Sequence, residues 1–243
     1  MISVCIAMHN GGKYIIEELN TILPQLGPND GVIISDDGST DGSLSLVESY
    51  CQRDNRVRML IRVNGGGQKP HYYVTKNFEN ALKYSKGEYI FLADQDDLWF
   101  DNKVKECIKY LSDYDVVVHE LTLCDELGKP MGKTWYGGNF HYHDPLKIHQ
   151  HGYQGCAMAF RRKILSAALP FPSELLVHDQ WIGCIGEAIG KAKFISEPLM
   201  YYRIHGDNVS GNYKSNNNIA TKVEYRLYFI KELIKRLLKY KLA

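Results

Sequence analysis

The first hundred residues alternate short apolar segments with segments of helical periodicity, and this alternation constrains the fold more than any other feature. Strands that alternate with helices at this spacing predict an α/β fold with a mostly parallel central sheet. In such folds ligands bind beyond the carboxyl ends of the strands. Strands are predicted at residues 2–8, 31–35, 57–63 and 88–93, and helices at 14–26, from about 43, and at 76–84.

Capping and loop chemistry set the expected limits of these elements. Either Asp41 or Ser43 is a plausible N-cap for the second helix, and Thr75 for the third. The polar segment 64–73 between the third strand and the third helix is expected to be a loop. Beyond residue 100 we predict helices at 101–113 and 179–189 and strands at 115–120 and 155–160.

A long stretch from Lys133 to Tyr153 is rich in aromatic and histidine residues and gives no clear periodicity. Two interpretations remain open: its aromatic rings form a platform for a sugar, or they lie in a mobile surface loop. The rings concerned are those of Trp135, Tyr136, Phe140 and Tyr142.

Composition bounds the class of protein. A chain of 243 residues with 44% hydrophobic and 23% charged residues can bury one large core, so we expect one domain with a tail. The formal net charge of +1 gives no overall attraction for nucleic acid. Six cysteines without a CxxC pair favour free thiols in the cytoplasm, and we expect neither a secretion signal nor a membrane-spanning segment.

Two predicted strands end in acidic turns, "SDDGSTDG" and "DQDD". Carboxylates so close together repel one another, so the second turn either spreads into solvent or holds a cation. Its oxygens suit Mg²⁺ or Mn²⁺ shared with a diphosphate. The first turn is equally typical of an Asx turn with a helix cap. Neither turn has the ligand order of an EF-hand, and "NGGGQK" lacks the P-loop spacing.

The C-terminal segment from Thr221 has helical periodicity, an apolar stripe and seven basic residues against two acidic ones. A basic amphipathic helix of this kind can lie on an anionic membrane. Docking on its own domain or on a partner chain is the other open interpretation. The stripe consists of Leu227, Ile230, Leu233, Ile234, Leu237 and Leu238.

Several ordered motifs together resemble glycosyltransferase family 2, whose members use nucleotide-sugar donors and have the GT-A fold. The resemblance is greatest to the bacterial branch with the rhamnosyltransferases of surface-polysaccharide assembly, and it spans about Ile2 to Gly211. The motifs are "VCIAMHNGGKYIIEEL", "IISDDGSTDGS", "KNFENALKYSKGEYIFLADQDDLW", "GCAMAFRR", "HDQWI" and "YYRIHGDNVSG".

The resemblance implies a division of the chain. A GT-A catalytic domain is expected over residues 1–211, with a nucleotide-binding half at 1–100 and an acceptor-binding half at 101–211. A linker and the basic amphipathic helix follow over residues 212–243.

The resemblance also implies roles for individual residues. Asp179 corresponds to the catalytic base of inverting members. Asp96, within the DxD motif that begins at Asp94, is the expected metal ligand, with His205 as a second; Asp97 completes the motif. Residues implied in nucleotide binding are Ala7, His9, Asn10, Asp36, Asp37, Asn77, Asp94 and Gln95. Residues implied at the donor sugar or acceptor are Gly155, Cys156, His178 and Trp181. The family usually has Tyr-Asn where this chain has His9-Asn10, which leaves base stacking at residue 9 open.

The resulting expectation is an inverting, metal-dependent hexosyltransferase with Mn²⁺ or Mg²⁺. It would move a sugar from a UDP-sugar or dTDP-rhamnose to a hydroxyl of a growing surface glycan, free or lipid-linked, in the cytoplasm or at the inner face of the plasma membrane. The oligomeric state stays open. A non-catalytic nucleotide-sugar-binding module on the same fold is the alternative, which has no need of a base at Asp179. A nucleotidyltransferase would need a phosphate-gripping basic loop, for which "HNGGKY" is a poor candidate.

Overall fold

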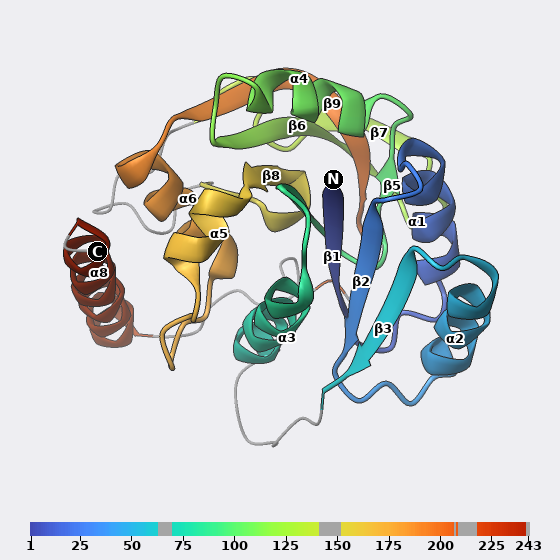
Figure 1. Ribbon diagram of the computed structural model, residues 1–243, viewed down its shortest axis with the longest axis horizontal. Helices are drawn as coiled ribbons and strands as arrows, with labels where there is room; N and C mark the ends of the chain where they lie inside the picture. Colours follow the sequence, from blue (N-terminus) through green and yellow to red (C-terminus); the bar gives the residue numbers. More distant parts are fainter. Residues whose placement is uncertain (63–69, 141–151, 207, 209–217, 242–243) are drawn as a thin grey trace.

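One curved mixed sheet forms the centre of the protein in this computed structural model, which describes residues 1–62, 70–140, 152–206, 208 and 218–241 (Figure 1). Nine strands lie within these residues, in the order β3-β2-β1-β4-β8-β6-β9-β5, and β7 pairs with β6. The strands are β1 (Ile2–Met8), β2 (Gly31–Asp36), β3 (Val57–Ile61), β4 (Tyr89–Ala93), β5 (Leu98–Trp99), β6 (Val116–Cys124), β7 (Pro130–Thr134), β8 (Met158–Arg161) and β9 (Ala192–Arg203).

Strands β1 to β4 pair in parallel, and this half of the sheet was predictable. β1 lies between β2 and β4, and β2 pairs with β3. Strand β8 then joins β4 and β6 in antiparallel fashion, while β6 and β9 are parallel. The predicted α/β fold with a single central sheet is confirmed, and the one sheet runs through both expected halves of the chain.

Helices flank the sheet on both faces (Figure 1). Their apolar faces meet a single core cluster, to which Ile15 and Leu19 of α1 and Phe78 of α3 contribute fully buried side chains. The helices are α1 (Ile15–Ile22), α2 (Ser43–Arg53), α3 (Pro70–Tyr84), α4 (Lys103–Leu111), α5 (Arg162–Ala168), α6 (His178–Ile189) and α8 (Ile219–Lys241), and short 3₁₀ turns are η1 (Leu23–Gln25) and η3 (Gly155–Ala157).

Three local predictions were wrong. Helix α3 begins at Pro70, so Thr75 lies inside it and cannot be its cap; proline suits a first helical turn because it needs no N–H partner there. Gly155–Ala157 is a 3₁₀ turn, and strand β8 starts only at Met158. For the second helix the N-cap is Gly42, and Asp41 instead accepts the Ser43 N–H at 3.0 Å.

The described rings of the aromatic segment after β7 pack inward, although residues 137–139 between them are exposed. Tyr136 is buried, and Phe140 stacks on Phe194 with ring centroids 5.0 Å apart. Trp135 lies against Tyr202 at 5.3 Å. These rings therefore cover the β6–β9 part of the sheet. Tyr142 and the expected boundary at residues 211 and 212 lie outside the described residues.

Helix α8 packs beside α5 and α6 at the edge of the molecule (Figure 1). Phe229 and Leu233 are its buried residues. The part of the chain that the structure describes contains no helix of the length and apolarity needed to cross a membrane.

Candidate functional site

The carboxyl ends of β1 and β4 are joined by a reciprocal pair of hydrogen bonds. The His9 N–H donates to Gln95 Oε1 at 2.8 Å, and Gln95 Nε2 donates to the His9 carbonyl at 3.0 Å. A Cβ at Gly11 would lie 2.5 Å from the same Oε1, so this contact requires glycine. Residues from two turns far apart in the sequence therefore form one edge of the candidate site.

In the turn after β2, the Asp36 carboxylate stabilises the turn itself. Asp36 Oδ2 accepts the N–H groups of Gly38 and Ser39 at 2.9 and 3.0 Å. This is the Asx turn that was one of the two interpretations of the segment. Asp37 forms an ion pair with Arg62. Burial raises the pKa of Asp37, and the charge of Arg62 opposes that change.

Asn10 connects this turn to the end of β1. Its N–H donates to Ser39 Oγ at 2.8 Å, and its Oδ1 accepts the Thr40 N–H at 2.8 Å. The backbone of Asn10 is left-handed, with φ of 51°, a conformation that asparagine tolerates better than most residues. His9 Nδ1 lies 3.0 Å from the Asp37 carbonyl, so both residues of the His-Asn pair hold the two turns together.

The acids after β4 form a buried cluster with a thiol. Ligand atoms of Asp94, Asp97 and Cys156 all lie within 4.8 Å of one another. Burial, and after it the charge of Asp96, raises the pKa of Asp94 to about 7. Burial also raises the pKa of Asp97 well above its ordinary value, and Asp97 Oδ2 has no hydrogen-bond partner. Hard carboxylate oxygens with an unsatisfied atom among them fit a divalent cation of the Mg²⁺ or Mn²⁺ type.

Two further ionisable side chains, those of Glu18 and Lys103, are buried near this cluster, and the sequence reasoning missed both. Glu18 of α1 is fully buried, its two carboxylate oxygens have no hydrogen-bond partner, and burial raises its pKa well above the ordinary value. Lys103 of α4 is also fully buried, and burial lowers its pKa. Lys103 Nζ donates to the Cys156 carbonyl at 2.7 Å and lies 3.8 Å from the centre of the Trp99 ring.

Arg203 at the end of β9 joins the acidic turn to the C-terminal part of the domain. Its N–H donates to Asp97 Oδ1 at 3.0 Å, and its Nε donates to the Asp96 carbonyl at 2.8 Å. A second guanidinium nitrogen donates to Glu17 at 2.7 Å. The predicted metal residues are neighbours here, because His205 Nε2 lies 2.7 Å from Asp96 Oδ2. The sequence reasoning gave Arg203 no role. Its place in the motif "YYRIHGDNVSG", two positions before His205, was the signal that could have identified it.

Asp179 lies in the first turn of α6 beside the 3₁₀ turn η3. Burial raises the pKa of Asp179 to about 6, while hydrogen bonds from the Gln180 and Gly155 backbones oppose the change. Asp179 lies close to η3, since a Cβ at Gly155 would be 3.7 Å from Asp179 Cβ. The next residue of η3, Cys156, groups with Asp94 and Asp97.

His178 stacks on Phe78 with ring centroids 4.2 Å apart, and its buried Nε2 has no partner. Burial lowers the pKa of His178 to about 3, so the imidazole is neutral at pH 7. A Cβ at Gly155 would lie 3.1 Å from this nitrogen, so even an alanine there would crowd the ring.

Three predicted residues lie at the margin of this arrangement or outside it. Trp181 is fully buried and donates through Nε1 to the Ala168 carbonyl at 3.0 Å, so it belongs to the core and does not line the site. Asn77 holds the Met8 carbonyl at 3.0 Å, and its buried Oδ1 has no partner. Ala7 is half-buried on β1, opposite Ser35.

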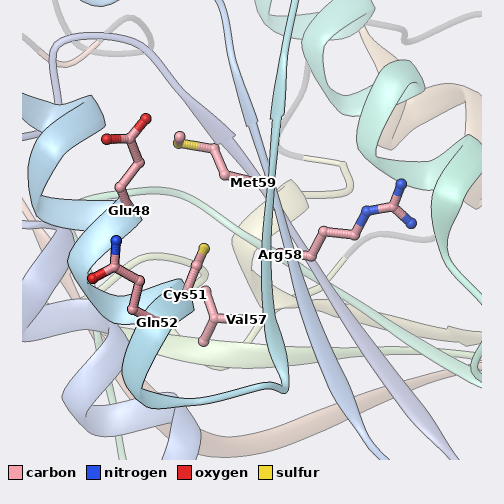
Figure 2. A pocket seen from close by; sticks show the side chains of 6 residues that line it. All are labelled: Glu48, Cys51, Gln52, Val57, Arg58 and Met59. Carbon is pink, nitrogen blue, oxygen red and sulfur yellow. The ribbon is translucent and has the colours of Figure 1, made fainter.

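A separate surface cavity of about 410 Å³ lies between α2 and β3 (Figure 2). Glu48 is the one acid among its lining residues, and no predicted site residue is there. Those residues are Glu48, Cys51, Gln52, Val57, Arg58 and Met59. The chemistry-bearing groups therefore gather at the strand ends and not in this cavity.

Residues 3–169 match the family model described as glycosyl transferase family 2. The chain belongs to glycosyltransferase family 2. The resemblance inferred from the motifs is thereby confirmed, although Asp179 and His205 lie beyond the matched residues.

Two curated relatives and one solved structure illustrate the similarity. The glycosyltransferase GlyG of Streptococcus pneumoniae is 36% identical over 128 residues, 52% of this chain and 40% of GlyG. The dTDP-rhamnosyl transferase RfbG of Shigella flexneri is 25% identical over 239 residues, 90% of this chain and 76% of RfbG. The chain thus spans well under half the length of GlyG.

A crystal structure of S. aureus TarS, residues 1–349, in complex with UDP-GlcNAc superimposes with a TM-score of 0.67. The identity is 20%, and the comparison covers 98% of this chain and 73% of that one. At this identity the likeness shows the fold alone, and it agrees with the predicted GT-A type.

Proposed function

We propose that this chain is a metal-dependent, inverting glycosyltransferase that moves a sugar from a nucleotide-diphosphate donor to a hydroxyl of a growing bacterial surface glycan. The observation that supports the proposal is that Asp179 of α6 lies against Gly155, next to Cys156, and the Cys156 thiol groups with Asp94 and Asp97 after β4. The similarity to RfbG, a dTDP-rhamnosyl transferase, over 90% of this chain favours transfer of a sugar from a nucleotide donor. The donor is a UDP-sugar or dTDP-rhamnose.

On this proposal the turns after β1 and β2 bind the nucleotide. Asp37 would accept hydrogen bonds from the base or ribose, and Asn77 Oδ1 and Gln95 lie beside the same strand ends. Asp36 contributes indirectly, since its carboxylate already holds the turn. His9 would lie beside the base and could pack on a pyrimidine through its ring.

Asp96 and His205 are the proposed ligands of Mn²⁺ or Mg²⁺, and Asp94 and Asp97 of the same turn, which group with Cys156, would supply further carboxylate oxygens next to them. The contact between Asp96 Oδ2 and His205 Nε2 at 2.7 Å supports this assignment, since both atoms point to one place. A divalent cation there would offset several kcal/mol of the negative charge that develops on the departing diphosphate. Arg203 and Lys103 would hold the acidic turn and the η3 turn in position.

Asp179 is the proposed general base. It would take the proton of the acceptor hydroxyl as that oxygen forms a bond to the anomeric carbon and the bond to the diphosphate breaks, which inverts the centre. A pKa of about 6 suits this role, because the carboxylate is mostly ionised at pH 7 yet basic enough to help. Neutral His178 would offer Nε2 to a hydroxyl of the donor sugar or the acceptor.

We place the reaction in the cytoplasm, at the inner face of the plasma membrane where a lipid-linked acceptor would be available. The six cysteines are free, as they would be in a reducing compartment.

A donor panel tests this function. UDP-galactose, UDP-N-acetylhexosamines and dTDP-rhamnose are incubated with the chain and Mn²⁺, and nucleotide release is measured. One donor should be turned over clearly faster than the others. Calorimetric titration of UDP with and without Mn²⁺ tests the metal, and equal affinity in both conditions would contradict it.

A further inference from the structure

Helix α8 has two distinct faces, and only one of them is used within the chain. On the inner face Phe229 and Leu233 are buried, and Phe229 meets Trp181 of α6 edge-on at 5.7 Å. Arg236 Nη1 donates to three carbonyls at the end of α5, those of Ala167, Ala168 and Leu169, at 2.7 to 3.0 Å. The helix is therefore firmly docked, and the single apolar stripe expected from the sequence divides into an inner and an outer part.

The outer face carries a line of large exposed apolar side chains. Their spacing of four, seven and four residues places them on one side of a helix. They are Val223, Leu227, Ile234 and Leu238, which are 44%, 63%, 52% and 58% exposed. A contiguous apolar strip on a folded protein marks a surface that meets another molecule or a membrane.

Lysines border this strip and indicate what covers it. Lys231, Lys235 and Lys239 are exposed along one side, at spacings of four residues. Of the two acids on α8, Glu232 is paired with Lys235 at 2.6 Å, and Glu224 is exposed near the start of the helix, away from Lys231 and Lys239. An apolar strip beside a row of ammonium groups complements an apolar layer under anionic headgroups. A second copy of the chain would instead bring equal rows of lysines together, which like-charge repulsion opposes.

We propose that the outer face of α8 docks on an anionic phospholipid bilayer. The apolar strip would enter the boundary between headgroups and acyl chains, and the lysines would reach the phosphates. The strip residues are already exposed while Phe229 and Leu233 of the same helix are buried, so docking needs no rearrangement of the domain.

Two hydrogen bonds connect α8 to the segment that precedes the proposed catalytic base. The Glu174 N–H donates to the Tyr228 hydroxyl at 3.0 Å, and the Leu176 N–H donates to the Tyr225 hydroxyl at 2.9 Å. The segment so held leads directly to His178 and Asp179. A bilayer under α8 would therefore lie beside the segment that carries the base, a consequence that rests on the proposed function.

Vesicle sedimentation tests the proposal with the full chain, without donor or metal. Vesicles of phosphatidylcholine alone are compared with an equal mixture of phosphatidylcholine and phosphatidylglycerol. We expect the chain to bind the mixed vesicles, and we expect this binding to weaken as the salt concentration rises. Leu227→Gln with Leu238→Gln should weaken binding at least about tenfold. The matched control is Ile61→Gln with Met131→Gln, at exposed apolar residues of β3 and β7, which should bind as the parent does.

A second pair of variants tests the charges. Lys231→Glu with Lys239→Glu should remove the preference for the anionic vesicles, while Lys105→Glu with Lys129→Glu should keep it; all four lysines are exposed. Thermal unfolding of each variant verifies that the fold is intact.

Equal binding by the Leu227/Leu238 variant and its control would overturn the proposal, as would a failure to bind anionic vesicles. Sedimentation velocity identifies the rival, since a dimer that the same leucine variant dissociates would make a second copy the occupant. Because no donor is present, these results do not depend on whether the chain transfers sugar.

Discussion

At the scale of single residues, Asp179 separates a catalytic role from a structural one. It lies in the first turn of α6, where a carboxylate is also favoured for the sake of the helix alone. Its pKa of about 6 and its influence on Asp94 are not needed for capping. The two roles predict different behaviour on substitution.

Asp179→Asn should keep donor and metal affinity but lower transfer by the 10²- to 10⁴-fold that a general base contributes. The parent should lose transfer as pH falls through about 6, since protonation removes the base, and this loss should be missing from the residual activity of the variant. Rates from nucleotide release at several pH values measure both effects. Near-parental transfer by the variant would show that the residue only caps the helix.

Lys103→Met should lower the free energy of unfolding by about 1–3 kcal/mol, because the Cys156 carbonyl and the buried acids lose their cation. Lys105→Met, at an exposed residue of the same helix, should change it by less than about 0.5 kcal/mol. Urea unfolding measures both.

If Lys103 acts through Glu18, adding Glu18→Gln should restore part of the loss. Strict additivity of the two changes would argue against that coupling.

The acids of the site were predictable from sequence, whereas the groups that support them were not. Asp94, Asp96 and Asp97 follow directly on an apolar strand, which is a local pattern. Glu18 falls on the same helix face as Ile15, Leu19 and Ile22, and Lys103 on the same face as Cys107 and Leu111, so a charge within an apolar helix face was the available signal. Only the packing of α1 and α4 shows that both side chains are fully buried. Their role depends on contacts between residues far apart in the chain.

At the scale of elements, burial on both faces explains which strands were predictable. β1, β2 and β4 lie inside the sheet and appear as continuous apolar runs. β9 alternates less regularly and contains Pro198, where its pairing with β6 shifts register, so no strand was predicted there. The family resemblance identified the motif "YYRIHGDNVSG", where β9 ends, but it did not indicate that this segment is a strand.

Tyr225→Phe with Tyr228→Phe should loosen the segment before Asp179, because the Glu174 and Leu176 N–H groups lose their acceptors. Each lost bond should cost about 0.5–1.5 kcal/mol. Hydrogen exchange at these two amides should become faster, and Tyr240→Phe, at an exposed residue of the same helix, is the control. Unchanged exchange would mean that the hydroxyls do not hold the segment.

At the scale of the whole molecule, the buried acids make metal-free stability depend on pH. Burial raises the folded-state pKa values of Glu18 and Asp97 above their ordinary values of 4.5 and 3.8. The folded chain therefore holds more protons than the unfolded chain above these values, so stability should fall as pH rises from about 4. The slope should not exceed about 1.4 kcal/mol per pH unit for each group.

Thermal unfolding between pH 4.5 and 8 in the presence of a chelator measures this slope, which Glu18→Gln should reduce. Mn²⁺ at 100 times its dissociation constant should add about 2.7 kcal/mol at neutral pH. Parallel curves for the parent and the variant would show that Glu18 does not contribute.

The bonds from Tyr225 and Tyr228 to the segment before Asp179 also have a thermodynamic consequence. Equilibrium coupling between two sites is reciprocal, so any factor by which a bilayer at α8 changes acceptor affinity is also the factor by which the acceptor changes adhesion. If the acceptor strengthens adhesion, a chain that has bound its acceptor would stay longer on the bilayer than one that has released its product. The residence time of the chain on the membrane would then depend on the fraction of time for which it has an acceptor bound.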